Sequence, residues 1–235
     1  MKQEQSMRIQ TSVLNAVEKD ILVWLAQRQP RWMTSDMLTA IGVVGAFVVA
    51  IGYVLSNFHP GWLWLSSLGF VINWYGDSLD GTLARVRGTQ RPIYGFYLDH
   101  NIDGVTMSVM CIGAGLSHLL NLYIAMCVLA LYLLLSISVY INAHLKGEFK
   151  LTYAGMGPTE FRLIMVVVNT LFALITPLRM WAMHFTLFGT SITFGAFDFV
   201  GLIILVVLLL IYLNNFKHDA ETYAKLDPAK PRAGN

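Results

Sequence analysis

The chain has 235 residues, of which 56% are apolar and only 13% carry a charged side chain. This composition is typical of an integral membrane protein and excludes a large soluble domain beside the apolar segments. The formal net charge of +2 says little by itself, and we expect no nucleic-acid partner. Cys111 and Cys127 lie in apolar segments without metal-ligand spacing, so we interpret them as small packing residues.

The leader, residues 1–32, is polar and contains an amphipathic pattern over residues 8–28. Its apolar residues recur mostly at intervals of three and four: Ile9, Val13, Leu14, Val17, Ile21, Leu22 and Leu25. This pattern predicts a helix that is too polar to span a bilayer and suited to lie in the headgroup layer. A soluble helix packed on a partner is the alternative. No cleavable signal peptide is visible, because a long charged leader precedes the first apolar run.

Six apolar segments follow the leader, and they predict an all-α, polytopic membrane protein. The expected spans are 34–55, 61–85, 95–118, 122–144, 158–182 and 198–216. Thr34, Pro60, Pro158 and Asp198 are residues that typically open helices. We therefore expect a cytoplasmic leader over 1–32, a six-helix transmembrane catalytic domain over 33–217 and a loose cytoplasmic polar tail over 218–235. Residues 183–196 are expected to be a connection that contains Gly and Thr.

The distribution of Lys and Arg predicts the orientation. All but one of the 16 basic residues fall in the leader, at the second–third or fourth–fifth connection, or in the tail. Only Arg179 falls on the other side. Because cytoplasmic segments carry the excess of Lys and Arg, both termini are expected in the cytoplasm, with the protein in the inner or cytoplasmic membrane.

Four aspartates stand out in the otherwise apolar second and third segments. Asp77 and Asp80 fall on one helical face together with Gly81 and Ala84, and Asp99 and Asp103 are one turn apart: this grouping is unusual for helix caps or solvated loop ends, which are the alternative. Ionised groups that face lipid are costly, so we expect them to face a wet cavity and to gather around cations. The charge pattern places this cavity at the cytoplasmic end of both segments.

The chemistry of these ligands favours phosphoryl transfer. Carboxylates without nearby Cys select Mg²⁺, Mn²⁺ or Ca²⁺ rather than zinc. Two pairs on adjacent helices could hold two ions ~4 Å apart, a pair that clamps the attacking and leaving oxygens of an in-line displacement at phosphorus. Gly81 and Ala84 would let a ligand approach closely, and Arg85 supplies a fork that matches phosphate oxygens. A membrane anchor is the alternative for Arg85.

At these residues the chain resembles the CDP-alcohol phosphotransferase (CDP-alcohol phosphatidyltransferase) family. The family signature reads D-x2-D-G-x2-A-R, a spacer, then G-x3-D-x3-D. It is matched by Asp77, Asp80, Gly81, Ala84, Arg85, Gly95, Asp99 and Asp103. The spacer from Val86 to Tyr94 is one residue longer than the commonest form, a departure that falls in a loop. The family also has six spans, in agreement with the segments above.

The resemblance implies roles for the matching positions. Metal ligands would be Asp77, Asp80, Asp99 and Asp103, holding two Mg²⁺ or Mn²⁺ ions. Asp103 would also act as the general base, Gly81, Ala84 and Arg85 would form part of the cytidine-diphosphate site, and Gly95 would allow close packing there. The implied reaction is attack of an acceptor alcohol on the phosphorus of a CDP-linked donor, with release of CMP. Family members are commonly homodimers.

Outside the motif, three more residues are candidates. Glu160 and Arg162 open the fifth segment and would line the cavity or bind the acceptor, unless they are a helix-opening Glu and an interfacial Arg. His100 follows Asp99, as in the choline and ethanolamine phosphotransferases, but a side chain that points toward a neighbouring helix or the headgroups is equally consistent with its position.

Two substrate arrangements and two other protein classes compete. We favour CDP-diacylglycerol with a small polar alcohol, because the chain is small; the alternative is a CDP-choline- or CDP-ethanolamine-type donor with diacylglycerol. A divalent-cation transporter would need polar residues through to the far side, but residues 62–71 and 105–116 are largely apolar. A structural membrane protein would leave the aspartates unexplained.

Overall fold

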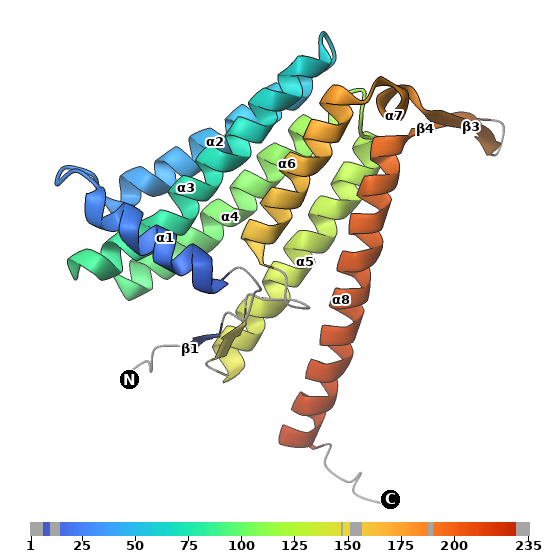
Figure 1. The fold of residues 1–235 in the computed structure, drawn as a ribbon. Helices are drawn as coiled ribbons and strands as arrows, with labels where there is room; N and C mark the ends of the chain where they lie inside the picture. Colours follow the sequence, from blue (N-terminus) through green and yellow to red (C-terminus); the bar gives the residue numbers. More distant parts are fainter. Residues whose placement is uncertain (1–6, 10–14, 147, 151–156, 188–189, 229–235) are drawn as a thin grey trace, which may run out of the picture.

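The computed structural model describes residues 7–9, 15–146, 148–150, 157–187 and 190–228, and these are mostly helical (Figure 1). The helices are α1 (Asn15–Arg28), α2 (Ser35–Leu55), the 3-10 helix η1 (Pro60–Trp62), α3 (Leu63–Arg87), α4 (Pro92–Gly115), α5 (Leu122–Lys146), α6 (Pro158–Leu174), α7 (Thr176–Met180) and α8 (Ala196–Leu226). The strands are β1 (Met7–Ile9), β2 (Glu148–Lys150), β3 (Ala182–Leu187) and β4 (Thr190–Gly195).

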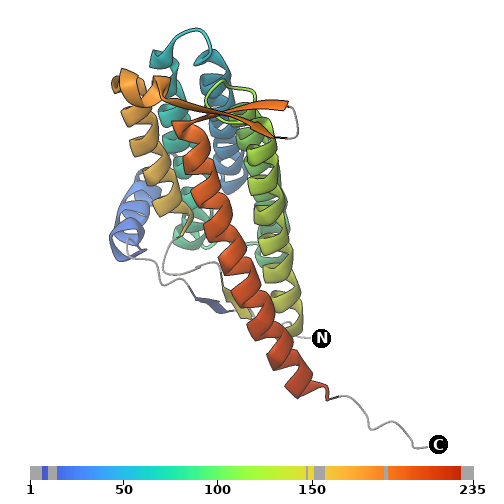
Figure 2. The ribbon, with the colours of Figure 1, turned by 90° about the vertical axis from the view of Figure 1, so that its right-hand side faces the viewer.

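The long helices form one bundle. Helices α2 to α6 and α8 run side by side, with α1 across one end of α3 and the β3–β4 hairpin at the opposite end (Figures 1 and 2). Strands β1 and β2 pair in parallel, whereas β3 and β4 pair antiparallel with Ala182 opposite Gly195. The expected all-α architecture is therefore confirmed for the bundle.

Three described helices are long and apolar enough to cross a bilayer: Ser35–Leu55, Leu122–Leu145 and Ala196–Leu226. They identify an integral membrane protein. The expectation of six spans is not confirmed by this criterion. Helices α3 and α4 contain the four aspartates, which lower their hydropathy, and α6 has only 17 residues.

Several predicted boundaries agree with the structure. Thr34 caps α2 by accepting a hydrogen bond from the Met37 backbone N–H at 3.2 Å. Pro158 is the first residue of α6. Asp198 lies in the first turn of α8, which begins at Ala196, and its carboxylate accepts a hydrogen bond from the backbone N–H of the N-cap residue Gly195 at 2.8 Å. The same carboxylate accepts one from the backbone N–H of Asn121, just before α5, at 2.6 Å.

Other predicted boundaries were wrong. Residues 8 and 9 of the expected leader helix lie in β1, α1 begins at Asn15, and residues 10–14 lie outside the described residues. The fifth segment ends at Leu174 instead of continuing to 182, since Pro177 lacks an N–H and its ring would clash with the preceding helical turn. Helix α8 continues to Leu226, well beyond the expected end at 216.

Helices α2 and α3 pack with their backbones in contact. A Cβ added at Gly76 would lie 2.2 Å from the Gly42 nitrogen, and one at Gly45 would lie 2.3 Å from the Asn73 nitrogen. The Asn73 side chain donates a hydrogen bond to the Gly42 carbonyl at 2.9 Å. Small residues allow this close approach, which is common between membrane helices. Asp77 follows Gly76 directly, so its helix is rigidly placed against α2.

Helix α1 is held on α3 by apolar and polar contacts. Its buried residues Leu22 and Ala26 belong to a cluster with Leu38, Leu79 and Leu83. Beyond the end of α1, the Arg87 guanidinium donates hydrogen bonds to the carbonyls of Gln29 at 3.0 Å, Pro30 at 2.8 Å and Met33. The Gln29 side chain donates to the Tyr75 hydroxyl at 2.7 Å. Arg87 thus ties the α1–α2 connection to the end of α3.

Candidate metal centre

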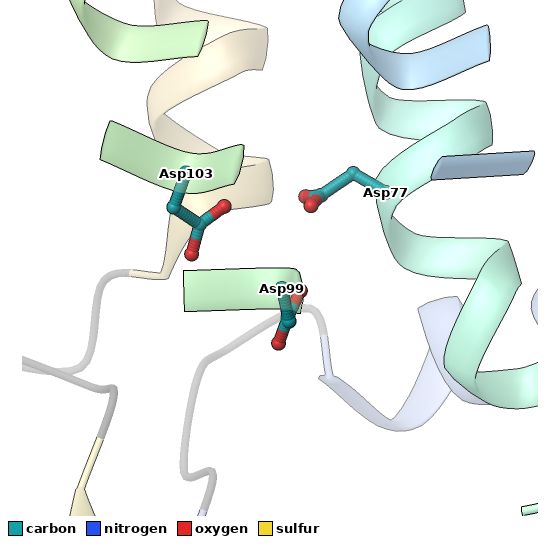
Figure 3. A group of neighbouring side chains, drawn as sticks. All are labelled: Asp77, Asp99 and Asp103. Carbon is teal, nitrogen blue, oxygen red and sulfur yellow. The ribbon is translucent and has the colours of Figure 1, made fainter. Parts of the chain in front are cut away.

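Three of the four predicted aspartates converge between α3 and α4. Asp77 from α3 and Asp99 and Asp103 from α4 each offer a carboxylate oxygen, and these oxygens lie within 4.8 Å of one another (Figure 3). Asp99 and Asp103 share one face of α4 because they are four positions apart. All three residues are partly buried. The expected convergence of the two helices' carboxylates therefore occurs for these three residues.

The spacing of these oxygens fits a hard divalent cation. Mg²⁺–oxygen distances are about 2.1 Å and Ca²⁺–oxygen distances about 2.3–2.6 Å, so two ligands of one ion lie at most roughly 4–5 Å apart. The separation of 4.8 Å or less is within that range. Clustered carboxylates repel one another when ionised, and a divalent cation would remove that repulsion. The donor set thus fits a divalent metal ion.

Asp80 does not belong to this three-carboxylate group in the described part of the chain. Its carboxylate instead accepts hydrogen bonds from the Thr39 hydroxyl at 2.6 Å and from the Gly81 backbone N–H. Its backbone carbonyl accepts one from the Ser35 hydroxyl at 3.0 Å. The first turns of α2 therefore orient Asp80, and its role as a metal ligand stays a prediction.

Arg162 of α6 completes the cluster on a third helix. Its Nη2 lies 2.5 Å from Oδ2 of Asp77, and the Arg162 side chain is only 14% exposed. The other terminal nitrogen, Nη1, is buried and has no hydrogen-bond partner among the residues that the structure describes. Buried donors are nearly always satisfied, so a guanidinium N–H without a described partner beside three carboxylates that could hold a metal is suited to an incoming anion.

The residues expected in the donor site lie nearby on α3 and α4, with space around them. Arg85 is exposed and donates a hydrogen bond to the Thr82 hydroxyl at 2.8 Å. A Cβ at Gly81 would meet only the Arg85 side chain, at 3.5 Å, and one at Gly95 would meet no described atom within 4 Å. Gly95 is therefore not in close contact with a described neighbouring helix, and its place in the donor site stays a prediction. Ala84 is partly buried, one residue before Arg85.

Glu160 and His100 have structural contacts. The Glu160 carboxylate accepts a hydrogen bond from the Gly157 backbone N–H at 2.9 Å, which caps α6. The His100 ring stacks on Phe96 with centroids 4.1 Å apart and lies 5.0 Å from the Tyr140 ring of α5. His100 Nδ1 is still 3.7 Å from an Asp99 oxygen. His100 thus packs among helix neighbours at the edge of the cluster.

Sequence reasoning missed Thr39 as a partner of the motif. It precedes Asp80 by 41 positions, and nothing in its local sequence marks it. A signal would have come only from pairing the glycines of α2 with those of α3, which places the first turns of α2 beside the aspartates.

Comparisons with known proteins agree with the motif. A family model described as CDP-alcohol phosphatidyltransferase matches residues 32–192, more than half of the chain. Cholinephosphotransferase 1 of Danio rerio is 32% identical over 96 residues, which are 38% of this chain and 25% of that protein. Phosphatidylinositol phosphate synthase of Cutibacterium acnes is 37% identical over 71 residues, 30% of this chain and 32% of that protein. The matched stretches therefore cover at most about a third of either relative. The length of the family match, together with the convergent aspartates, shows that the chain belongs to the CDP-alcohol phosphatidyltransferase family.

Proposed function

We propose that this protein is a metal-dependent membrane transferase of phospholipid synthesis. It would move a substituted phosphate group from a CDP-alcohol to an acceptor alcohol and release CMP. The observation that carries this proposal is the convergence of Asp77, Asp99 and Asp103 with Arg162, inside the segment that matches the family model. Both relatives carry names of enzymes that handle phospholipid headgroups. Family membership also argues against a cation transporter.

The four aspartates would hold two Mg²⁺ or Mn²⁺ ions. The three converging carboxylates would hold the first ion, and Asp80 would turn toward a second one while the Thr39 hydroxyl stays hydrogen-bonded to one of its oxygens. When bound, such ions neutralise the pyrophosphate and stabilise charge on the attacking and leaving oxygens. The remaining steps fall to the chain's own side chains.

Asp103 would accept the proton of the acceptor hydroxyl, since an alcohol is a poor nucleophile until it loses that proton. Arg85 would bind the phosphates of the donor, with Gly81, Ala84 and Gly95 leaving space for the cytidine nucleotide. Glu160 remains a candidate for lining the cavity in addition to capping α6. Arg162 would direct its unpartnered Nη1 at an anionic group of the acceptor.

The acceptor is proposed to be a small polar alcohol that carries a phosphate, with CDP-diacylglycerol as the donor. A guanidinium whose Nη1 has no partner in the described part of the chain, beside the proposed metal ligands, matches an acceptor phosphate better than it matches uncharged diacylglycerol. The similarity to a phosphatidylinositol phosphate synthase supports this arrangement. The reverse arrangement, with a CDP-linked small alcohol and diacylglycerol, is favoured by the similarity to a cholinephosphotransferase.

In the membrane, we propose six spans with both termini and the metal centre in the cytoplasm, most simply in the inner or cytoplasmic membrane. At ~1.5 Å per residue, the 25 residues of α3 and 24 of α4 are long enough for the roughly 30 Å hydrocarbon layer. The leader over 1–32, the helical domain over 33–217 and the tail over 218–235 remain the proposed organisation. A homodimer could cover the exposed apolar side of α8, which includes Ile203, Leu210, Leu213 and Phe216.

Release of CMP tests the proposed function. Purified protein would be assayed with Mg²⁺ and one of three donors, CDP-diacylglycerol, CDP-choline or CDP-ethanolamine. Each donor would be combined in turn with inositol phosphate, glycerol phosphate, serine or diacylglycerol as the acceptor. We expect CMP and a new phospholipid only with CDP-diacylglycerol and a phosphorylated alcohol, and none from Asp99→Asn. Product with diacylglycerol and CDP-choline would establish the reverse arrangement. The absence of CMP with every pair from folded, metal-loaded protein would contradict the proposal.

A further inference from the structure

One carboxylate oxygen connects α1 to two helices of the metal centre. Oε1 of Glu18, in the first turn of α1, accepts a hydrogen bond from the Trp74 indole N–H of α3 at 2.8 Å. The same oxygen accepts one from the Thr159 hydroxyl of α6 at 2.6 Å. Glu18 is partly buried, and its helix lies across the end of the bundle where α6 begins (Figure 1). Three helices therefore meet at Glu18.

Trp74 and Thr159, which donate these two hydrogen bonds, lie next to the Asp77–Arg162 ion pair. Trp74 precedes Asp77 by three positions on α3, and Thr159 precedes Arg162 by three positions on α6. Residues three apart are neighbours on a helix surface. The Glu18 junction and the ion pair are thus two separate connections between the same two helices, one turn apart on each. Hydrogen bonds to an ionised carboxylate are among the stronger ones.

Helix α1 does not need Glu18 for its own attachment. At its other end, Leu22 and Ala26 are buried in the cluster with α2 and α3. The Gln29–Tyr75 hydrogen bond and the Arg87 contacts also hold the end of α1 and the connection after it. All of these contacts reach α2 or α3. Among the described residues, the hydrogen bond between α1 and α6 is the one from Thr159 to Glu18. The distinctive effect of Glu18 is therefore on the first turn of α6.

We propose that Glu18 is a positioning residue that fixes the start of α6 against α3, and thereby holds Arg162 in register with Asp77. Glu18 touches neither the metal ligands nor the proposed substrate space. Its effect on catalysis rests on the proposed function, in which Arg162 binds the acceptor. Without Glu18, the Arg162–Asp77 ion pair would be left without the second connection between α6 and α3 one turn away. Arg162 would then sample more orientations, and acceptor binding would weaken while donor binding would not.

Hydrogen exchange tests the junction without any assay of activity. In Glu18→Ala, the backbone amides of residues 161–166 in α6 should exchange roughly three- to tenfold faster, as expected for the loss of one to two net hydrogen bonds. Glu18→Gln keeps an acceptor oxygen and should exchange within about twofold of the unsubstituted protein. Asp20→Ala removes the same charge from an exposed position of α1 and is the matched control. Unchanged exchange in Glu18→Ala would overturn the proposal.

Steady-state kinetics test the link to Arg162. Glu18→Ala should raise the acceptor KM roughly three- to tenfold with little change in donor KM, and Glu18→Gln should restore it. Thr159→Val removes one of the two hydrogen bonds to Glu18 and should therefore raise the KM for the acceptor substrate less than Glu18→Ala does. Adding Thr159→Val to Glu18→Ala should change this KM no further. Equal effects on both substrates, or a fully additive double variant, would reduce Glu18 to a general stabilising contact.

The two measurements fail separately. If the unsubstituted protein releases no CMP, the proposed function fails, while hydrogen exchange still decides whether Glu18 holds α6. If the protein is active and α6 exchanges faster in Glu18→Ala without a change in acceptor KM, the positioning role is overturned and the transferase assignment stands. Should Glu18→Ala fail to fold, Thr159→Val alone must show both faster exchange in α6 and a higher acceptor KM, or the proposal is wrong.

Discussion

Arg162 Nη2 lies 2.5 Å from Asp77 Oδ2, so the Arg162 guanidinium of α6 pairs directly with one of the three clustered carboxylates. The pair has two consequences. It lowers the electrostatic cost of grouping three carboxylates, and it aligns the guanidinium so that Nη1 is buried with no partner among the residues described. A site arranged in this way contains fixed positive charge next to the place where a metal and a phosphate would meet.

The first prediction follows from that geometry. Arg162→Lys keeps the charge but loses the planar fork, so the ammonium cannot hold Asp77 and an acceptor phosphate at the same time. We expect the acceptor KM to rise about tenfold or more, with a smaller change in donor KM. Arg91→Lys is the control, because Arg91 is exposed and its 3.7 Å pair with Asp36 is also exposed. An equal rise in both KM values would place Arg162 outside the acceptor site.

The second prediction concerns metal ligation by Asp77 and Asp99. Replacing either with Asn keeps the shape and removes the charged oxygen, so divalent-cation affinity and CMP release should both be lost while the fold is retained. Isothermal titration with Mn²⁺ and circular dichroism in detergent would measure these separately. Asp36→Asn, on the exposed first turn of α2, should behave like the unsubstituted protein. A variant of either aspartate with near-normal activity would remove that residue from the ligand set.

The third prediction separates Asp103 from Asp77. As the proposed base, Asp103 acts on the acceptor, so Asp103→Asn should abolish transfer while donor binding in Mg²⁺ largely survives on the other aspartates. Asp77→Asn should lose both. Calorimetric titration of the two variants with the CDP-donor, side by side, makes the comparison. Loss of donor binding in Asp103→Asn as complete as in Asp77→Asn would make Asp103 mainly a metal ligand, and Glu160 would become the next candidate for the base.

The fourth prediction concerns the glycines between α2 and α3. A methyl group at Gly45 would lie 2.3 Å from backbone atoms of Asn73, which cannot move aside as a flexible side chain could. Gly45→Ala should therefore cost about 1–3 kcal/mol of stability and should reduce activity by displacing α3. Gly95→Ala is the matched control for stability, because a Cβ there meets no described atom within 4 Å. Thermal unfolding in detergent would detect the difference, and equal melting temperatures would contradict the packing argument.

The fifth prediction tests the six-span topology. A cysteine at Thr89, in the connection between α3 and α4, should react with a membrane-impermeant reagent only from the cytoplasm. The second cysteine, which should react only from the opposite side, is best placed at the exposed His118. Neighbouring Ser117 is less suitable, because it is only 7% exposed and its hydroxyl donates a hydrogen bond to the Ala114 carbonyl. Both probes belong in a background without Cys111 and Cys127. Labelling of both positions from the same side would overturn the topology.

Local sequence was sufficient to predict much of the fold and part of the centre. Thr34 and Pro158 marked helix starts because the signals that open a helix lie within a few residues of the end. The four-residue spacing of Asp99 and Asp103 predicted that both lie on one face of a helix, because this too depends only on local periodicity. The β3–β4 hairpin was interpreted as a connection, since its strands are only six residues each and the single Gly189 between them was not weighed as a hairpin signal.

Long-range partners could not be predicted. The hold of Thr39 on Asp80, the pairing of Arg162 with Asp77 and the junction at Glu18 each join residues that are dozens of positions apart. They depend on which helices become neighbours, and in this chain the glycines at the α2–α3 contact decide part of that. Helical periodicity gives the faces of a helix but does not assign a partner to each face.

The backbone contact between α2 and α3 also bears on how the enzyme would respond to bilayers of different thickness. Interlocked glycines prevent one helix from sliding along the other, so a thicker or thinner membrane can tilt the two helices only as a unit. Asp80 of α3 and Thr39 of α2, whose hydroxyl orients the Asp80 carboxylate, would therefore move together. Strain from hydrophobic mismatch would then fall on α8, a 31-residue helix that the rest of the described chain leaves mostly unburied and that contributes none of the three clustered carboxylates.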